Sequence, residues 1–295
     1  MNTPHKAGFV SIIGKPNVGK STLMNRLLGE DLSVVTPKAQ TTRHRIKGIL
    51  NAPEYQIVFS DTPGIMKPAY KLHERMLEAV DATLDDSDAV MLVVEVGERF
   101  LSPEVEAKLN RSQAPLVLVI NKIDISAQEE LEARVEMWKS LLNPKVIIPV
   151  SAQENFNVQS VVDALVELMP PHEPYFDKED LSDRNVRFFV QEIIREKILL
   201  QYQKELPYSC EVTVREYKEQ AETDVIRCDI FVDRESQKAI ILGHKGAAIK
   251  SLGIASRIAI EKFTGKKVHL ELTVKVRGDW RNDDSQLDRF GYKEF

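Results

Sequence analysis

The chain has 295 residues, of which 43% are hydrophobic and 29% are charged, and its formal net charge at pH 7 is -5. This length allows one to three domains. The composition is that of a soluble globular protein with enough apolar residues for a large core. The residues at the start form no apolar signal-peptide core, and no apolar run is long enough to cross a bilayer, so we expect a cytoplasmic protein.

The average charge does not suggest a nucleic-acid-binding protein, but the charge is unevenly distributed. Residues 236–281 contain 10 Lys and Arg against 3 Asp and Glu, a local net charge of +7. Such a segment can bind a polyanion, although most charge runs are only solvated surfaces. Cys210 and Cys228 have no further cysteine or other ligand pattern beside them. We therefore expect two core residues rather than a zinc site.

Strand and helix patterns alternate through the first part of the chain. Strand patterns cover 9–13, 45–51, 56–60, 88–94, 116–120 and 146–150, and helical patterns cover 21–28, 72–84, 102–110, 128–142 and 158–169. A turn signal at 52–54 indicates a hairpin between the second and third strands. The alternation predicts an α/β domain, with a mostly parallel sheet and helices on both faces.

The pattern changes after residue 169. Prolines at 170, 171 and 174 and a polar, acidic stretch at 177–183 predict a linker. We place the first domain at 1–172, the linker at 173–184 and the second domain at 185–295. Within the second domain the predicted order is helix 186–203, strands 209–216 and 225–233, helical stretches on either side of 243–246, and strand 268–276. This is an α+β arrangement of order α-β-β-α-α-β.

The first motif is a phosphate-binding loop. Residues 14–21 read GKPNVGKS between a strand pattern and a helix pattern, which is the context that G-x-x-x-x-G-K-[ST] requires. The loop amides and the positive end of the helix hold phosphate oxygens. Lys20 would reach the outer phosphates and Ser21 would ligate Mg²⁺; a Gly-rich turn is the alternative. The predicted nucleotide contacts are Gly14, Lys15, Pro16, Asn17, Val18, Gly19, Lys20, Ser21 and Thr22.

A second motif, DTPG at residues 61–64, follows the strand pattern 56–60. Asp61 would hold Mg²⁺ through water, and the Gly64 N–H would contact the γ-phosphate, with Thr62 and Pro63 completing the loop. Alone, such a sequence is a turn. After a phosphate-binding loop and a buried strand, it indicates a sensor of metal and phosphate.

Two further loops predict the base-binding end of the site. Residues 121–124 read NKID directly after a strand, and the Asp124 carboxylate can accept both N1–H and N2–H of guanine, a pairing that adenine cannot offer. Asn121 would brace the loop and Lys122 would cover the base; an Asn cap with an exposed Asp is the alternative. Ser151 and Ala152 follow another strand, which leaves the Ala152 N–H available to the guanine oxygen. The carboxyl ends of parallel strands share one sheet edge, so these loops should meet.

These motifs in this order resemble the signature of GTP-binding proteins. The polar residues 36–43 resemble the first switch segment of such proteins, whose threonine closes over Mg²⁺ and the γ-phosphate. We predict Thr42 as this ligand, with Thr41 as the second choice. The predicted metal ligands are therefore Ser21, Thr42 and Asp61, and the predicted catalytic groups are Lys20, Thr42 and Gly64.

Two positions bear on hydrolysis. Ras-like enzymes place Gln after the glycine of the second motif to orient the attacking water, whereas this chain has Ile65. Either hydrolysis is slow, or the backbone, a cation or a partner orders the water. Asn17 is similar to the Asn of potassium-stimulated relatives, which makes K⁺ a candidate cofactor; an ordinary loop-bracing Asn is equally consistent with the sequence.

The last motif is GHKG at residues 243–246, inside the +7 segment and between two apolar helical stretches. Such a loop lets a nucleic-acid backbone approach closely, as in KH domains, which clamp about four nucleotides. The predicted RNA contacts are Gly243, His244, Lys245, Gly246, Lys250 and Arg257. An exposed loop histidine is the alternative for His244. Ile240, Ile241 and Ile249 could form the floor of a groove for the bases, although a role in the helix core is expected for most of them.

Over nearly its whole length the chain resembles the Era family, bacterial Ras-like GTPases with a C-terminal type II KH domain. The matching stretches include 14–22, 40–45, 61–64, 121–124, 151–152, 192–197, 206–209 and 269–276. The resemblance implies a monomeric GTP-hydrolysing switch with GTP or GDP and Mg²⁺, which binds small-subunit (16S) ribosomal RNA and assists maturation of the small ribosomal subunit.

The resemblance also implies some peripheral contact with the inner membrane. Two other functions fit the same residues. One is an RNA-binding protein that uses GTP only as a structural ligand, which Ile65 favours slightly. The other is a GTP-dependent, membrane-associated switch whose basic face meets anionic lipid.

Overall fold

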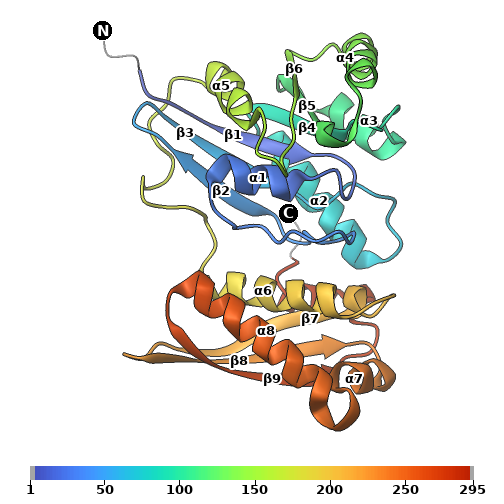
Figure 1. The fold of residues 1–295 in the computed structure, drawn as a ribbon, viewed down its shortest axis with the longest axis vertical. Coiled ribbons are helices and arrows are strands. Elements are labelled where there is room, and N and C mark those ends of the chain that lie inside the picture. The colour runs from blue at the N-terminus through green and yellow to red at the C-terminus, as the bar shows by residue number, and fades with distance from the viewer. Residues whose placement is uncertain (1–3, 293–295) are drawn as a thin grey trace. The chain divides into compact units, whose positions relative to one another are not determined.

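The computed structural model describes residues 4–292 (Figure 1), which form two compact units. The first unit comprises residues 4–183 except 70–72, and the second comprises residues 184–292 together with 70–72. Residues 173–183, which the sequence predicts as part of a linker, belong by their contacts to the first unit.

The first unit is built on a six-stranded sheet of order β2-β3-β1-β4-β5-β6. Its strands are β1 (Lys6–Ile13), β2 (Ile46–Asn51), β3 (Tyr55–Asp61), β4 (Ala89–Glu95), β5 (Leu116–Asn121) and β6 (Val146–Pro149). All neighbouring pairs are parallel except β2 and β3, which are antiparallel. The predicted hairpin and the mostly parallel sheet are therefore confirmed.

Five helices cover this sheet (Figure 1): α1 (Lys20–Leu28), α2 (Lys71–Asp85), α3 (Pro103–Arg111), α4 (Gln128–Leu142) and α5 (Val158–Leu168). Val90, Leu92 and Val94 of β4 pack in one core with apolar residues of α2, α3 and α4. Successive strand residues point to opposite faces, and the alternate residues Met91 and Val93 are fully buried as well. Both faces of the sheet are therefore covered, as parallel sheets require.

The edge strand β2 carries the segment 173–183. Gln56 of β3 is fully buried, and its side-chain oxygen accepts the N–H groups of Tyr175 at 2.7 Å and Phe176 at 3.0 Å. The Ile49 N–H donates to the Leu181 carbonyl at 3.0 Å. The Ile49 bond satisfies a backbone N–H that the edge strand β2 would otherwise leave exposed, and the two Gln56 bonds attach the segment to the neighbouring strand β3. This part of the predicted linker is therefore attached to the sheet and is not a free tether.

The second unit has the predicted order α-β-β-α-α-β. It contains α6 (Val186–Gln201), β7 (Glu211–Lys218), β8 (Thr223–Val232), α7 (Glu235–Leu242), α8 (Ala247–Thr264) and β9 (Lys267–Val276). The sheet has the order β7-β8-β9, with an antiparallel and then a parallel pair. Cys210 and Cys228 are buried in its core, as expected.

The sequence analysis missed a short helix, α9 (Asp284–Arg289). Asp283 caps it by accepting the Gln286 N–H at 3.2 Å. Six mostly polar residues are too few to produce a helical periodicity, so only the cap could have indicated this helix.

A buried ion pair lies inside the second unit. The Arg195 guanidinium donates to both carboxylate oxygens of Glu192, one turn away on α6, and both residues are less than 5% exposed. The Tyr292 hydroxyl donates to Glu211 at 2.8 Å, and both are buried. Burial of charges is tolerated only where they are paired and hydrogen-bonded, so α6 depends on this pair.

We expect Glu192→Ala to lower the free energy of unfolding of the second unit by about 3–5 kcal/mol, because it removes the carboxylate to which the buried Arg195 guanidinium donates. Amide hydrogen exchange of α6 and β7 in increasing urea measures this change. Glu222→Ala in the exposed β7–β8 loop is the control, with an expected change within about 0.5 kcal/mol. Equal stability of the two variants would contradict a structural role for the pair.

Candidate functional site

The phosphate-type loop joins β1 to α1 in a conformation that requires its glycines. Gly14 has φ 150° and Gly19 has φ 98°, values that favour glycine. A Cβ on Gly14 would lie 2.3 Å from the Val93 carbonyl oxygen, and one on Gly19 would lie 2.2 Å from Asn121 Nδ2. The loop is therefore packed tightly on both sides.

Lys20 folds back over this loop. It is 6% exposed, and its Nζ donates to the carbonyl oxygens of Gly14 at 3.2 Å and Lys15 at 3.0 Å. Burial lowers the pKa of Lys20 to about 8, an effect that the charges of Asp61 and Glu98 partly offset. Bound phosphate would restore a strong preference for the charged form, because an anion beside a buried ammonium stabilises it.

Three oxygen-bearing side chains from distant parts of the sequence converge beside the loop. Asp61 Oδ2 accepts hydrogen bonds from Ser21 Oγ at 2.7 Å and Thr42 Oγ1 at 3.2 Å, and the two hydroxyls are 2.8 Å apart. Asp61 is fully buried, and its Oδ1 has no hydrogen-bond partner among the described residues. Burial raises the pKa of Asp61, against the effect of the Ser21 hydrogen bond. A hard cation with oxygen ligands would satisfy this group.

The chemistry of these residues fits Mg²⁺. Within residues 4–292 no group of three or more His, Cys, Asp or Glu side chains could hold a metal ion. Mg²⁺, however, is usually held by one or two carboxylates together with substrate phosphates and water, and Asp61 with the Ser21 and Thr42 hydroxyls matches that pattern. Thr41 lines the same cleft but does not join this group, because its Oγ1 contacts Thr36 Oγ1 at 2.9 Å and donates to the Lys38 carbonyl at 2.6 Å.

The DTPG loop rests directly on the phosphate-type loop. Thr62 donates to the Ile12 carbonyl at 2.7 Å, and the Ile65 N–H donates to the Gly14 carbonyl at 3.1 Å. A Cβ on Gly64 would lie 2.7 Å from Pro16 Cα. The Ile65 side chain is 1% exposed and packs in the core with residues of α2. It therefore points away from any attacking water and cannot orient it.

Asn121 connects the two ends of the site. Its Nδ2 donates to the Val18 carbonyl at 2.9 Å, and its Oδ1 accepts the Ala152 N–H at 3.0 Å. The expectation that the Ala152 N–H is available to a guanine oxygen is therefore corrected, because that N–H is already engaged. Asp124 Oδ1 accepts the Ser151 hydroxyl at 2.6 Å, which fixes the carboxylate predicted to read the base.

Three predicted residues have partners within the protein. Lys122 forms an ion pair with Glu95 at 2.8 Å. Lys15 Nζ lies 2.6 Å from Glu98 and 5.0 Å from the centre of the Phe100 ring, so its side chain does not line the cleft. The Asn17 amide donates to the Pro37 carbonyl at 3.3 Å, which is the loop-bracing role. A potassium-binding role for Asn17 stays a prediction.

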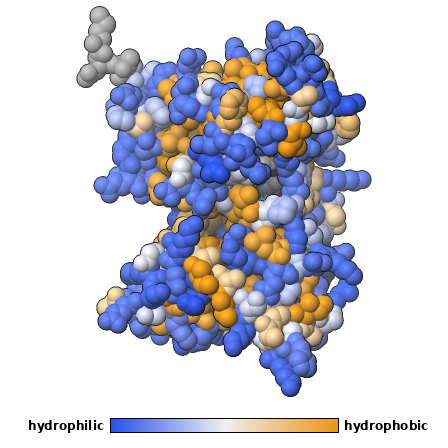
Figure 2. Space-filling model, in the orientation of Figure 1, coloured by the Kyte–Doolittle hydropathy of each residue, from blue (hydrophilic) through white to orange (hydrophobic). Residues whose placement is uncertain are grey.

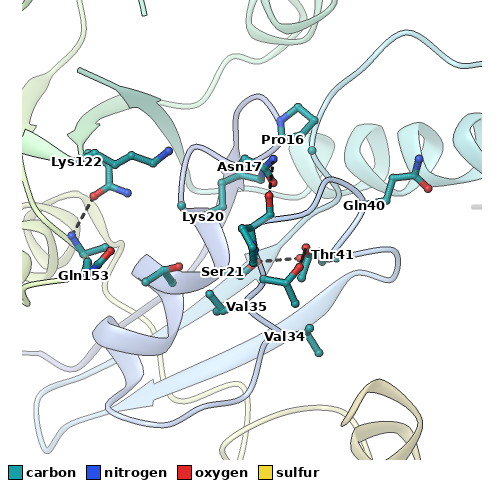
Figure 3. Close-up of a pocket in the computed structure, with 18 of the residues that line it drawn as sticks. Pro16, Asn17, Lys20, Ser21, Val34, Val35, Gln40, Thr41, Lys122 and Gln153 are labelled. Atoms are coloured by element: carbon teal, nitrogen blue, oxygen red, sulfur yellow. Dashed lines mark hydrogen bonds between the residues drawn. The ribbon is translucent and has the colours of Figure 1, made fainter. Parts of the chain in front are cut away.

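The loops enclose a cleft of about 490 Å³ (Figure 3), a size typical of small-molecule sites. Figure 3 shows Lys122 and Gln153 on one side of the cleft and Pro16, Asn17 and Gln40 on the other. Of the predicted nucleotide contacts, those that line it are Pro16, Asn17, Gly19, Lys20, Ser21, Thr22, Thr42, Gly64, Asn121, Lys122, Asp124 and Ala152.

The remaining predicted contacts are not among the residues that line the cleft: Gly14, Lys15, Val18, Asp61, Thr62, Pro63 and Ser151. Thr36, Pro37, Gln40 and Thr41 of the predicted switch segment also line the cleft. The sequence analysis missed Val34, Val35, Ile125 and Gln153, which line it too. Each of these residues lies within two positions of a predicted motif or of the switch segment, and this closeness in sequence could have been used to predict them.

The second unit presents the G-x-x-G loop at its surface. Gly243 and Gly246 have φ of 69° and 80°, and His244 and Lys245 are exposed. A Cβ on Gly243 would lie 2.6 Å from the Ala248 Cβ, whereas the space around Gly246 is open. The loop therefore brings backbone and positive charge to the surface together, as a nucleic-acid clamp requires.

Beside this loop lies a groove of about 330 Å³ between α8 and β9. It is lined by Ile249, Lys250, Gly253, Ile254, Arg257, Leu270 and Leu272. Apolar side chains thus form its floor, and Arg257 Nη1 pairs with Glu261 at 3.0 Å. Ile254 and Ile258 of α8 are about half exposed, and Figure 2 shows apolar side chains at the surface of this helix. Ile241 is in the core, as expected, but Ile240 is 56% exposed.

We expect Asp124→Asn to weaken guanine nucleotide binding by about 10⁴-fold and to shift preference toward xanthine, because the amide places a donor where the carboxylate accepted one. Titration with fluorescent GDP and xanthosine diphosphate measures the change. Asp163→Asn, on the exposed face of α5, is the control. Wild-type GDP affinity in a folded Asp124→Asn variant would show that Asp124 does not read the base.

Comparisons with known proteins agree with this geometry. The family described as "50S ribosome-binding GTPase" matches residues 9–122, and the KH domain family matches residues 205–281. The chain is 43% identical over 294 residues to a chloroplastic GTPase ERA-like protein of Oryza sativa subsp. japonica, covering 98% of this chain and 70% of that protein. It is 42% identical over 295 residues to the GTPase Era of Staphylococcus haemolyticus (strain JCSC1435), covering 99% of each.

Two solved structures are similar over nearly the whole chain. Era in complex with MgGDPNP and nucleotides 1506–1542 of 16S ribosomal RNA has a TM-score of 0.92 at 37% identity, covering 98% of this chain and 99% of that one. An Aquifex aeolicus Era variant bound to GDP.AlF4- has a TM-score of 0.92 at 37% identity, covering 97% and 99%. With a phosphate-type loop, a guanine-type loop and an exposed G-x-x-G loop in one chain, this protein belongs to the Era family of GTPases.

Proposed function

We propose that this protein binds and hydrolyses GTP with Mg²⁺, binds small-subunit (16S) ribosomal RNA through its KH domain, and assists small-subunit maturation. The observation that carries the proposal is the arrangement of the cleft. It has Ser21, Thr42 and Asp61 at one end and Asn121 and Asp124 at the other. In this proposal the functional domains are residues 1–172 and 185–295, joined by 173–184.

The phosphate end supports hydrolysis through preorganised charge. Lys20 would leave its two carbonyl partners and donate to the β- and γ-phosphates, where it stabilises charge that grows in the transition state. The Gly64 N–H would contact the γ-phosphate from the DTPG loop. When bound, Mg²⁺ would be held by Ser21, Thr42 and Asp61 and would neutralise phosphate charge.

The attacking water needs a different support from that in Ras-like enzymes, because Ile65 is buried in the core. We propose that backbone groups of the switch segment and a K⁺ ion near Asn17 take this part. Asn17 lies in the phosphate-type loop and bonds to Pro37 of the switch segment, so a cation there would adjoin both. Faster turnover in KCl than in NaCl at equal ionic strength supports this role, and equal rates argue against it.

The proposed RNA binding is supported by the surface of the second unit and by a similar Era structure. A G-x-x-G loop clamps a nucleic-acid backbone while an adjacent groove receives bases, and here the groove has an apolar floor with Lys250 and Arg257 at its lining. A similar Era structure holds nucleotides 1506–1542 of 16S ribosomal RNA. We therefore propose the 3′ end of the small-subunit RNA as the target of this groove.

We further propose a monomer in the cytoplasm, with peripheral contact with the inner membrane through basic surface residues. Within residues 4–292 no helix has both the length and the apolar character needed to span a bilayer. Binding to single-stranded RNA and to anionic vesicles at matched salt separates the RNA-binding role from a membrane role, since both depend on positive charge.

We expect Lys20→Ala to abolish steady-state GTP hydrolysis, because the transferred phosphoryl group loses its cation in the transition state. Phosphate release under multiple-turnover conditions, with and without ribosomal RNA, is the measurement. The exposed Lys139→Ala on α4 is the matched control and should keep full activity. Hydrolysis at the wild-type rate in Lys20→Ala would remove this lysine from the catalytic groups, and absence of turnover in the unaltered chain would favour GTP as a structural ligand.

We expect the double variant His244→Asp/Lys245→Asp to lose RNA binding steeply while it keeps GTP binding. The aspartates place negative charge where an RNA phosphate should lie, and the loop glycines remain. Lys266→Asp/Lys267→Asp, at the other end of α8, is a control with at least as large a change in charge. Fluorescence anisotropy with the 3′-terminal RNA segment, in GTP analogue, GDP and no nucleotide, gives the affinities.

Any effect of RNA on GTP affinity must equal the effect of GTP on RNA affinity. Both effects should therefore disappear together in the double variant at accessible RNA concentrations. Undiminished RNA binding by the double variant would contradict the assignment of the G-x-x-G loop. If the unaltered chain binds RNA equally well with GTP analogue, with GDP and without nucleotide, the hypothesis that nucleotide state controls RNA binding would be contradicted.

A further inference from the structure

Arg26 connects the helix that follows the phosphate-type loop to the base-binding end of the cleft. It lies in the last turn of α1, and its Nε donates to the Ala152 carbonyl at 3.1 Å while its Nη2 donates to the Gln153 carbonyl at 3.3 Å. We propose that Arg26 is a positioning residue for guanine recognition, which it achieves by holding residues 151–153 in place. This inference rests on the proposed GTP site.

The loop that Arg26 holds determines where the Asp124 carboxylate lies. Ser151 donates to Asp124 at 2.6 Å and accepts the Glu154 N–H at 3.2 Å. The loop closes through two backbone bonds between Ser151 and Phe156, at 3.2 and 2.9 Å. A shift of this loop would therefore carry the Ser151 hydroxyl away from Asp124, and a carboxylate that is misplaced by a fraction of an ångström pairs poorly with a base.

Helix α1 is a suitable anchor because it also carries the phosphate end of the site. Lys20 is its first residue, and Arg26 lies six residues later, which corresponds to about 9 Å along a helix. Leu23 and Met24 between them are fully buried and Leu27 is nearly so, so the helix is held firmly by the core. One rigid element thereby fixes the separation between the phosphates and the base.

The peptide groups of Ala152 are held from two sides. Asn121 accepts the Ala152 N–H, and Arg26 donates to the Ala152 carbonyl. Asn121 is 2% exposed and also bonds to the phosphate-type loop, so its replacement would disturb the core. Arg26 is at the surface. Replacing Arg26 therefore removes its bonds to the Ala152 and Gln153 carbonyls without opening a cavity in the core.

The planar guanidinium is suited to this task. Its N–H donors diverge in a fixed geometry, so it can donate to two successive carbonyl oxygens at once, whereas the compact lysine ammonium acts as a point charge. We therefore expect Arg26→Lys to keep part of the support for residues 151–153, and so part of the guanine affinity, and Arg26→Gln to lose this support.

The loss of Arg26 should lower nucleotide affinity by the same factor for GDP and GTP, because both carry the same base. We expect Arg26→Gln to weaken both about tenfold, which corresponds to about 1.4 kcal/mol. The rate at saturating GTP should stay within about twofold, as for a loss of binding common to ground and transition states. Affinity for ADP, which lacks the guanine pairing, should not change.

The experiment is a fluorescence titration of the full chain with mant-GDP, mant-ADP and a non-hydrolysable mant-GTP analogue. The variants are Arg26→Gln, Arg26→Lys and the control Arg111→Gln, whose side chain is 66% exposed at the end of α3. Thermal unfolding without nucleotide accompanies each titration. The expected result is an equal loss for the two guanine nucleotides in Arg26→Gln, partial recovery in Arg26→Lys, and no change in the control.

Three results would overturn the role of Arg26. The first is unchanged guanine affinity in Arg26→Gln. The second is a loss confined to the GTP analogue or shared with ADP, which would locate the effect at the phosphates. The third is a lowered unfolding temperature in Arg26→Gln with no recovery of guanine affinity in Arg26→Lys, which would indicate general structural damage. Unchanged guanine nucleotide affinity in Asp124→Asn would instead contradict the guanine site itself. A failure of the Arg26 proposal can therefore be distinguished from a failure of the proposed GTP site.

Discussion

The cleft depends on one buried side chain, the amide of Asn121. Its nitrogen donates to the carbonyl of Val18 in the phosphate-type loop, and its oxygen accepts the N–H of Ala152. Both bonds are shielded from water, since Asn121 is 2% exposed, and a buried polar group left without partners destabilises a fold by about 1–3 kcal/mol. The same contact explains Gly19, where any Cβ would meet the amide at 2.2 Å.

Around this link, the phosphate end holds charged groups that are only partly satisfied without a ligand. Burial lowers the pKa of Lys20 to about 8 and raises the pKa of Asp61. Both shifts follow from the cost of removing a charge from water. Phosphate and a cation would supply the missing partners, so the fold keeps these groups oriented before the ligand arrives. Such preorganisation is what electrostatic catalysis requires.

The edge strand β2 adjoins two segments for which the sequence predicts no helix or strand. The switch segment 36–43 leads into it, and residues 173–183 bond both to Ile49 of β2 and to the buried Gln56 side chain of the neighbouring strand β3. In the second unit the G-x-x-G loop presents the exposed His244 and Lys245, while the Glu192–Arg195 pair is buried in α6. In the second unit the charges of the core are thus separate from those that can meet a ligand, whereas in the first unit Lys20 and Asp61 are buried and serve both purposes.

The sequence by itself determined the element order, the sheet type and the residues of the main motifs, because strand and helix periodicity are local and the carboxyl ends of parallel strands meet at one edge. Element boundaries agreed to within a few residues, and of the α-helices and strands within residues 4–292 the short α9 was the one missed. The tertiary structure decided what depends on contacts between distant residues. It brought Thr42 rather than Thr41 to Ser21 and Asp61, engaged the Ala152 N–H with Asn121, and drew Lys15 to Glu98. It also placed Arg26 on a loop 126 residues away, because the side chain that fills a given space is set by packing across the sheet and not by its neighbours in sequence.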